Sequence, residues 1–174
     1  MRRVSSLAIL AYALAIVVIL ADQALKYWVL DVYRLPERLS ELAALGNDRP
    51  SIAVFGPFHL TLVANKGVSF GFMNIEASWT RWALTAFSLA VAAALAVWVW
   101  RVEKLLLAVS VGLIMGGAVG NAIDRIHLGA VTDFLDFSTL HFPWVFNIAD
   151  SAISVGSVLL VWDLFLAPRK RAGD

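Results

Sequence analysis

The feature that most constrains this chain is a set of long stretches without a charged residue. They cover Val4 to Ala21, Trp82 to Trp100 and Leu105 to Ile123. About 20 apolar residues in a helix are enough to cross the hydrocarbon core of a bilayer. The composition, 60% hydrophobic and only 16% charged, also lies outside the range of soluble domains. The sequence therefore predicts an α-helical membrane protein with a single domain that covers residues 1–174.

A fourth apolar stretch runs from about Phe146 to Leu166 and is followed by a basic tail. We expect four membrane-spanning helices, at about residues 5–24, 82–100, 105–124 and 146–166. Basic residues at both ends of the chain and between the second and third stretches favour the cytoplasmic side. Both termini are therefore predicted in the cytoplasm, and the segments of about 27–80 and 126–145 on the outer side. A cleavable signal peptide explains the first stretch less well, because further membrane segments follow it.

The outer segment between the first two stretches contains weaker patterns. Pro36 to Gly46 predicts a short amphipathic helix, because its leucines recur at threefold spacing and glycine ends it. Two β-like runs, Phe58 to Ala64 and Val68 to Met73, flank Asn65-Lys66-Gly67 and predict a small hairpin.

Small residues recur every four positions on the last two helices. Gly112, Gly116 and Gly120 do so on the third, and Ala152 and Gly156 on the fourth. We interpret them as packing positions, because small residues let helix backbones approach closely in lipid.

Several classes of function are disfavoured by composition. The chain has no cysteine, and its three histidines are scattered, so we expect no metal site and no cofactor. With a net charge of +1 and no basic cluster interleaved with aromatic residues, nucleic-acid binding is not expected.

Polar residues that are costly near a bilayer gather at the predicted outer ends of the helices. They come from all parts of the chain: Asp22, Asn65, Asn121, Asp124, Asp133 and Asp150. Asn121 and Asp124, like Asn147 and Asp150, are three residues apart and so share a helical face. Convergence of this kind indicates an active site.

Two carboxyls held close together share one proton, so that one can activate water while the other polarises a carbonyl. The residues favour Asp133 and Asp150 as this pair, with Asp124 and Asp22 as ionised supports, but spacing alone leaves the choice open. An alternative is that the acids cap helices and form ion pairs with Lys26 and Arg125. Asp22 and Lys26 alone are equally consistent with a solvated interfacial ion pair.

A rival function is a small proton-coupled transporter or channel, since intramembrane carboxylates relay protons. Such a protein would place its acids near the midplane, often in related halves. Here they gather at one side, and no such symmetry is visible.

Five motifs in order resemble the lipoprotein signal peptidase family, also called signal peptidase II. They are Asp22-Gln23-x-x-Lys26, Asn65-x-Gly67-x-x-Phe70-Gly71, Gly116-Gly117-Ala118-x-Gly120-Asn121-x-x-Asp124-Arg125, Val131-x-Asp133-Phe134 and Phe146-Asn147-x-Ala149-Asp150. Each motif alone is weak, but the five together cover nearly the whole chain.

The resemblance implies an aspartic endopeptidase of the bacterial inner membrane, which removes the signal peptide of diacylglyceryl-modified prolipoproteins just before the lipidated cysteine. The implied catalytic residues are Asp133 and Asp150. The supporting residues are Asp22, Lys26, Asn65, Gly67, Gly117, Asn121, Asp124, Arg125 and Asn147. Membrane lipids and globomycin-type inhibitors are implied partners, and no metal or cofactor is required.

The resemblance also implies that the outer hairpin forms a β-cradle. The segment between the third and fourth helices would form a lid helix, and the active site beneath it would lie near the periplasmic face. The chain departs from the family where Val68 and Ser69 replace two alanines, and where the segment from Leu35 to Pro50 is longer than usual.

Overall fold

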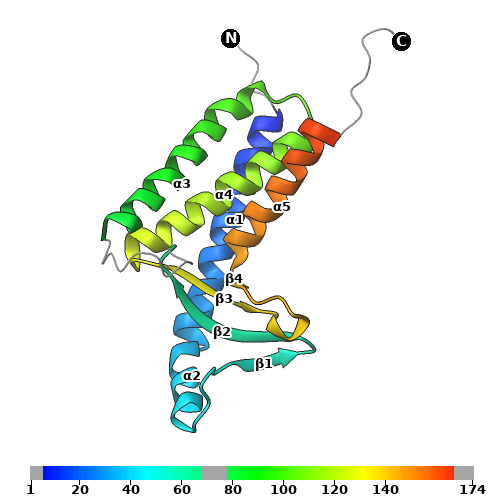
Figure 1. The fold of residues 1–174 in the computed structure, drawn as a ribbon. Coiled ribbons are helices and arrows are strands. Elements are labelled where there is room, and N and C mark those ends of the chain that lie inside the picture. Colours follow the sequence, from blue (N-terminus) through cyan, green and yellow to red (C-terminus); the bar gives the residue numbers. More distant parts are fainter. Residues whose placement is uncertain (1–5, 68–77, 167–174) are drawn as a thin grey trace.

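The computed structural model describes residues 6–67 and 78–166, which form a helical bundle with a small sheet at one end (Figure 1). The long helices are α1 (Ser6–Tyr27), α3 (Ser78–Trp98), α4 (Leu105–His127) and α5 (Ile148–Val161). Short helical turns extend three of them: η1 (Trp28–Val32) follows α1, η2 (Val99–Arg101) follows α3 and η4 (Trp162–Leu166) follows α5. Among the described residues, three helices are long and apolar enough to cross a membrane, namely Ser6–Val32, Trp79–Arg101 and Leu105–His127. The predicted fourth helix is present as α5 and η4, but it is shorter than these three.

Helix α4 is the centre of the bundle and contacts α1, α3 and α5. The glycines of α4 make its contact with α1 close. A Cβ atom on Gly112 would lie 2.7 Å from the carbonyl oxygen of Ala11, and one on Gly116 would lie 2.7 Å from that of Ala15. Because helices in lipid associate through close packing rather than through the hydrophobic effect, the small residues decide which helices pair. The packing role predicted for the glycine repeat is confirmed.

The start of α1 lies near η4, at the end of the bundle that is far from the sheet (Figure 1). There the ammonium group of Lys104 lies 3.0 Å from a carboxylate oxygen of Asp163. This ion pair joins the connection between α3 and α4 to η4. Asp163 is therefore far from the acids at the sheet end of the bundle.

The sheet lies at the other end of the helices and has four antiparallel strands in the order β1-β2-β3-β4. They are β1 (Ile52–Phe55), β2 (Phe58–Asn65), β3 (Val131–Asp136) and β4 (Val145–Phe146). Residues that are far apart in sequence meet in the pairing of β2 with β3, where Val63 is opposite Asp133 and Asn65 is opposite Val131. The sheet thus fixes Asp133 relative to the segment that ends at Asn65.

Two expectations about the outer segments are corrected. Strand β2 is confirmed, but its hairpin partner is β1, and its other neighbour is β3. The expected partner, Val68 to Met73, lies outside the described residues. The segment of 126–145 was expected to form a lid helix, and this is wrong. It forms β3, the three-residue turn η3 (Ser138–Leu140) and β4. Tertiary pairing with β2 and burial of Phe134 favour the strand.

The predicted amphipathic helix is confirmed as α2 (Leu35–Ala44), with proline in its first turn. Its buried leucines, Leu35 and Leu39, pack with Val29, Leu60 and Phe134. The long segment from Leu35 to Pro50 therefore covers one face of the sheet, and the small core beneath it joins the sheet to the end of α1.

We predict that Gly116→Val lowers the free energy of unfolding by about 1–3 kcal/mol, because the added side chain forces α4 away from α1. The measurement is unfolding in detergent. Ala94→Val, at an exposed position of α3, serves as the control and should change stability little. Equal stability of the two variants would contradict the packing role of Gly116.

Candidate active site

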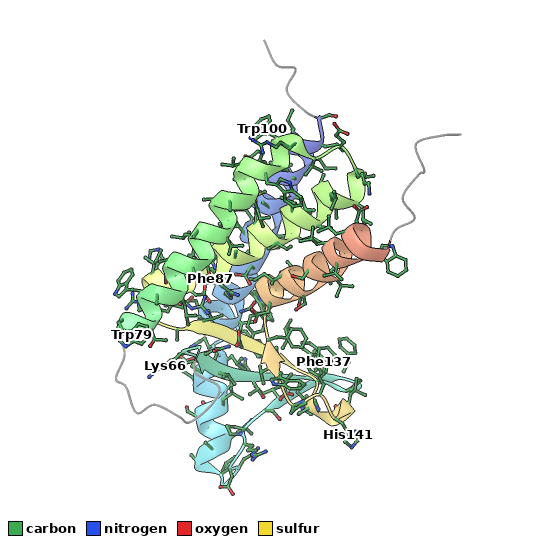
Figure 2. The ribbon with its side chains drawn as sticks, turned by 45° about the horizontal axis from the view of Figure 1, so that its top comes forward. Lys66, Trp79, Phe87, Trp100, Phe137 and His141 are labelled. Atoms are coloured by element: carbon green, nitrogen blue, oxygen red, sulfur yellow. The ribbon has the colours of Figure 1, made fainter. Side chains whose placement is uncertain are left out.

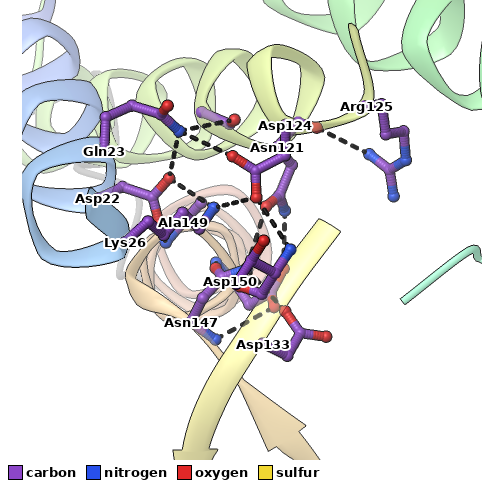
Figure 3. A network of polar contacts seen from close by, with 12 residues as sticks. Asp22, Gln23, Lys26, Asn121, Asp124, Arg125, Asp133, Asn147, Ala149 and Asp150 are labelled. Atoms are coloured by element: carbon purple, nitrogen blue, oxygen red, sulfur yellow. Dashed lines mark hydrogen bonds and ion pairs between the residues drawn. The ribbon is translucent and has the colours of Figure 1, made fainter. Parts of the chain in front are cut away.

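Asp133 and Asp150 are joined through two asparagine side chains (Figure 3). Asp133 lies in β3 and is 1% exposed, while Asp150 lies in the first turn of α5. The amide nitrogen of Asn147 donates to Oδ1 of Asp133 at 2.8 Å, and that of Asn121 donates to Oδ1 of Asp150 at 2.7 Å. The same Asn147 nitrogen also contacts Oδ1 of Asn121 at 3.2 Å. The strand acid and the helix acid are therefore held in one network.

Asn147 is the N-cap of α5 and is completely buried. Its Oδ1 accepts the backbone N–H of Asp150 at 2.8 Å, and the carboxylate of Asp150 accepts the backbone N–H of Asn147 at 3.4 Å. This reciprocal capping box satisfies donors that a helix start leaves free. The capping role weighed as an alternative for these residues is thus real, and it also orients Asp150.

The carboxyl of Asp133 is held in an unusual protonation state for an aspartate. Burial raises its pKa to about 7, and the negative charge of Asp150 acts in the same direction. The hydrogen bond from Nδ2 of Asn65, 3.0 Å long, favours the ionised form and opposes part of this effect. Burial and the charge of Asp150 therefore both favour the protonated form of Asp133.

Asn65 and Gly67 shape the edge of the site. Asn65 is the last residue of β2, and its Oδ1 accepts the backbone N–H of Gly67 at 2.9 Å. Gly67 has a φ of +79°, which glycine adopts without strain. The turn therefore directs the other end of the Asn65 amide at Asp133.

A buried cation supports the site from the helix side. The ammonium of Lys26 lies 2.7 Å from Oδ2 of Asp22 and 2.8 Å from Oδ2 of Asp124. Lys26 is 3% exposed, so the interpretation of a solvated interfacial pair is wrong. The sequence shows only that Asp22 and Lys26 share a face, whereas the second acid comes from α4.

The two acids of this group also hold the backbone around the site. Oδ1 of Asp22 accepts the N–H of Ala149 at 2.9 Å, and Oδ2 of Asp124 accepts the N–H of Thr132 at 2.9 Å. Ala149 precedes Asp150 and Thr132 precedes Asp133. Each supporting acid therefore fixes the residue next to one member of the pair.

Gln23 belongs to the same group, although we did not predict it as a site residue. Its side-chain nitrogen donates to Oδ1 of Asp124 at 2.9 Å and contacts Oδ2 of Asp22 at 3.1 Å. The sequence signal was its place in the motif Asp22-Gln23-x-x-Lys26.

Gly117 and Arg125 occupy different positions at the site. A Cβ atom on Gly117 would clash with the carbonyl oxygen of Ala149, so this glycine lets the start of α5 approach α4. Arg125 is half-buried and interacts electrostatically with Asp150, Asp124 and Asp133. Its Nη1 is 3.5 Å from the carbonyl oxygen of Asn121, and its buried Nε has no partner among the described residues.

Asp133 opens onto a cavity of about 450 Å³, here called the inner cavity. It is lined by Val63, Ala64, Asn65, Lys66, Asp133, Pro143, Trp144 and Val145. In the part of the chain that the structure describes, no group of three or more His, Cys, Asp or Glu residues is arranged to hold a metal ion. Of the two acids, Asp133 is the one that lines this cavity.

The family model described as signal peptidase (SPase) II matches residues 14–166. The chain belongs to the signal peptidase II family. A lipoprotein signal peptidase of Caulobacter vibrioides is 47% identical over 93% of this chain and 90% of its own length. Another, from Shewanella loihica, is 40% identical over 94% of this chain and 90% of its own length.

Two solved structures, both described as bacterial membrane enzymes studied by the in meso method, share the fold. One, at 1.9 Å resolution, has a TM-score of 0.68 and 25% identity, and covers 91% of this chain and 94% of its own. The other, at 2.3 Å resolution, has a TM-score of 0.66 and 22% identity, and covers 92% and 93%. Together with the apolar helices, they identify this member of the signal peptidase II family as a bacterial membrane protein.

We predict that Lys26→Met lowers the free energy of unfolding by about 3–5 kcal/mol, because it leaves two buried carboxylates without their cation. The control is Glu37→Gln, which breaks the exposed pair with Arg34 and should cost less than about 1 kcal/mol. The measurement is unfolding of each variant in detergent. A Lys26→Met protein as stable as the control variant would contradict the supporting role of the buried group.

Proposed function

We propose that the chain is an aspartic endopeptidase that cleaves the signal peptide from diacylglyceryl-modified prolipoproteins, just before the lipidated cysteine. Family membership supports the substrate class. The observation that carries the chemistry is the joint network of Asp133 and Asp150, in which burial and the charge of Asp150 raise the pKa of Asp133 to about 7. A pair of carboxyls that keeps one proton near neutral pH suits acid–base hydrolysis of a peptide bond.

In the proposed mechanism, Asp133 holds the proton and Asp150 is the carboxylate. Asp150 accepts a proton from a water molecule, whose oxygen attacks the scissile carbonyl carbon. Asp133 donates its proton to the carbonyl oxygen, which gives a tetrahedral diol intermediate. When the C–N bond breaks, the carboxyl of Asp150 gives its proton to the leaving amine, and the diol returns a proton to Asp133. The pair is thereby ready for another cycle.

The supporting residues have positional roles in this proposal. Asn121 holds the carboxylate of Asp150 through a charge-assisted hydrogen bond. Asn147 and Asn65 hold the two oxygens of Asp133. The unpaired Nε of Arg125 is available to a carbonyl of the substrate backbone. The buried group of Asp22, Lys26 and Asp124 fixes the backbone beside the two catalytic acids. Gly67 permits the turn after Asn65, and Gly117 permits the close approach of α5 to α4.

We also propose the setting of the enzyme. The bundle crosses the bacterial inner membrane four times, with α5 and η4 as the fourth crossing and both termini in the cytoplasm. The sheet end then lies at the periplasmic face, where the substrate leaves the bilayer. Membrane lipids surround the helices, and globomycin-type inhibitors bind at the site. The basic residues at both ends of the sequence support this orientation.

We expect Asp133→Asn and Asp150→Asn each to reduce cleavage of a diacylglyceryl-modified precursor by about 10³-fold or more, because neither variant retains the acid–base pair. The measurement is release of the signal peptide by protein inserted into membranes. Asp31→Asn, an exposed aspartate outside the site, is the matched control and should cleave normally. The precursor without diacylglyceryl serves as the substrate control. Full activity in either catalytic variant would reject the pair.

The pKa of Asp133 gives an expected pH dependence. Above pH 7 the pair loses its last proton, so kcat/KM should fall as pH rises and approach a tenfold loss per unit. A rate that is constant or rising between pH 7 and 9 would contradict the assignment of the proton to Asp133.

A stability measurement reports on the same group without a substrate. Because the folded-state pKa is raised above the ordinary value of 3.8, the neutral carboxyl stabilises the fold at low pH, and this contribution is lost as pH rises through about 7. The stability of the wild type relative to Asp133→Asn should therefore decrease from pH 5 to pH 8.

A further inference from the structure

Helix α3 supplies no group to the proposed mechanism, although it packs along α4. Its first turns lie at the sheet end of the bundle, where α4 ends (Figure 1). Figure 2 shows Trp79, near the start of α3, on the same side of the molecule as Lys66, which lines the inner cavity. Trp100, in η2, marks the opposite end. The start of α3 is therefore placed to act on the site from outside.

Arg81 of α3 holds the end of α4. Its Nη2 donates a hydrogen bond to the backbone carbonyl of Ile126, in the last turn of α4. The last four carbonyls of a helix have no partner within the helix, and a cation near them also interacts favourably with the helix dipole. Arg81 therefore fixes the point at which the chain leaves α4.

The same guanidinium lies against the turn that leads from α4 to β3. A Cβ atom on Gly129 would lie 3.5 Å from Nη1 of Arg81, so the backbone comes close to the arginine there. In addition, Asp124 accepts the N–H of Leu128 through its backbone carbonyl and that of Thr132 through its carboxylate. The turn is therefore held by α3 as well as by α4.

Arg81 is held in place by its own helix. Its guanidinium carbon lies 4.8 Å from the ring centroid of Trp82, where the face of the ring attracts a cation. Its backbone carbonyl accepts a hydrogen bond from Oγ1 of the buried Thr85 at 2.8 Å. Among the described residues, no carboxylate forms an ion pair with Arg81, and its buried Nε has no partner. The guanidinium is thus directed at the backbone beyond α4 rather than at an acid.

A second contact joins α3 to the other strand of the pair. The side chain of Leu84 occupies the space that a Cβ atom on Gly67 would need. Gly67 follows Asn65, which ends β2 and donates to Oδ2 of Asp133. Asn65 is opposite Val131, the first residue of β3. The start of α3 therefore contacts the chain just after β2 and just before β3, at the adjacent ends of two paired strands.

We propose that Arg81 is a positioning residue of the active site, which holds the turn between α4 and β3 and thereby the carboxyl of Asp133. Leu84 supports the same arrangement from the side of β2. This inference rests on the proposed function, because the placement of Asp133 matters there for catalysis. Arg81 acts through the backbone between Gly129 and Asp133 rather than on the substrate.

The first test is the rate at which a diacylglyceryl-modified precursor is cleaved. Arg81→Met should lower kcat by about 10- to 100-fold, because a misplacement of about 1 Å in a catalytic group has an effect of this size. KM should change by less than about twofold, since no substrate contact is removed. Arg101→Met changes an exposed arginine at the opposite end of the same helix, in η2, and as the matched control should behave as the wild type.

Arg81→Lys grades the effect. A lysine keeps the charge, but its ammonium group cannot both donate to Ile126 and lie against Gly129 as the planar guanidinium does. The kcat of Arg81→Lys should therefore fall between those of the wild type and Arg81→Met, again with an unchanged KM. Each kcat is expressed per folded molecule, so a lower yield of folded protein does not change it.

Hydrogen exchange tests the position of the turn without a substrate. In Arg81→Met, the N–H groups of Leu128 and Thr132 should exchange about fivefold to tenfold faster, because the turn that contains their bonds to Asp124 loses a support. The N–H groups of residues 152–161 in α5 should exchange as in the wild type. The measurement is made on the full chain in detergent.

A matched pair of leucines tests the second contact. Leu84→Ala should lower kcat by about three- to tenfold and leave KM unchanged, because the turn at Gly67 loses its packing partner. Leu89→Ala, at a position of the same helix that is 42% exposed, should behave as the wild type. Equal kcat values in the two leucine variants would reject the supporting role of Leu84.

The outcomes separate this inference from the proposed function. If the wild type cleaves no lipidated precursor, the proposed function fails, and hydrogen exchange alone decides whether Arg81 holds the turn. If the wild type cleaves and Arg81→Met keeps its kcat, or loses it without faster exchange at Leu128 and Thr132, the positioning role is overturned. Should Arg81→Met not fold, the same two measurements on Arg81→Lys decide.

Discussion

The site depends on one buried amide, the side chain of Asn147. Its oxygen caps α5 and so fixes the turn that carries Asp150, while its nitrogen reaches Asp133 and the side chain of Asn121. A strand, the central helix and the last helix therefore meet at this one side chain. Because a buried amide that loses its partners is costly, each of these elements constrains the positions of the others. The distance between the two carboxyls follows from this constraint rather than from either carboxyl alone.

The buried cation explains how several carboxylates coexist in so small a volume. Lys26 compensates Asp22 and Asp124, and these acids in turn hold the backbone N–H groups of Ala149 and Thr132. Among the described residues, neither Asp133 nor Asp150 forms an ion pair with a lysine, although the more distant charge of Lys26 still acts on Asp133. The cluster lies at the sheet end of the helices rather than along their length (Figure 1). This placement suits a reaction on a chain that leaves the bilayer, and it does not suit a proton path through the midplane.

The helices and the identity of the polar residues were predictable because both signals are local. Uncharged runs predicted the long helices, and leucine spacing predicted α2. The pairing of β2 with β3 was not predictable, because it joins Asn65 to Val131 across two helices. The burial of Lys26 was missed for the same reason, since Asp124 comes from a distant helix. The sequence motifs located the candidate acids well, but the way they share a cation and an amide required the three-dimensional arrangement.

The division of the pair between a strand and a helix has a physical consequence. Along a strand, neighbouring side chains point to opposite faces, so a slip of one residue in the pairing of β2 with β3 would turn Asp133 away from Asp150. Two contacts oppose such a slip: Thr132 is held by Asp124 of α4, and Asn65 of β2 donates to Asp133 itself. The register of the sheet is thus fixed from the helix bundle. The same contacts keep the carboxyl of Asp133 directed at the side chain of Asn147.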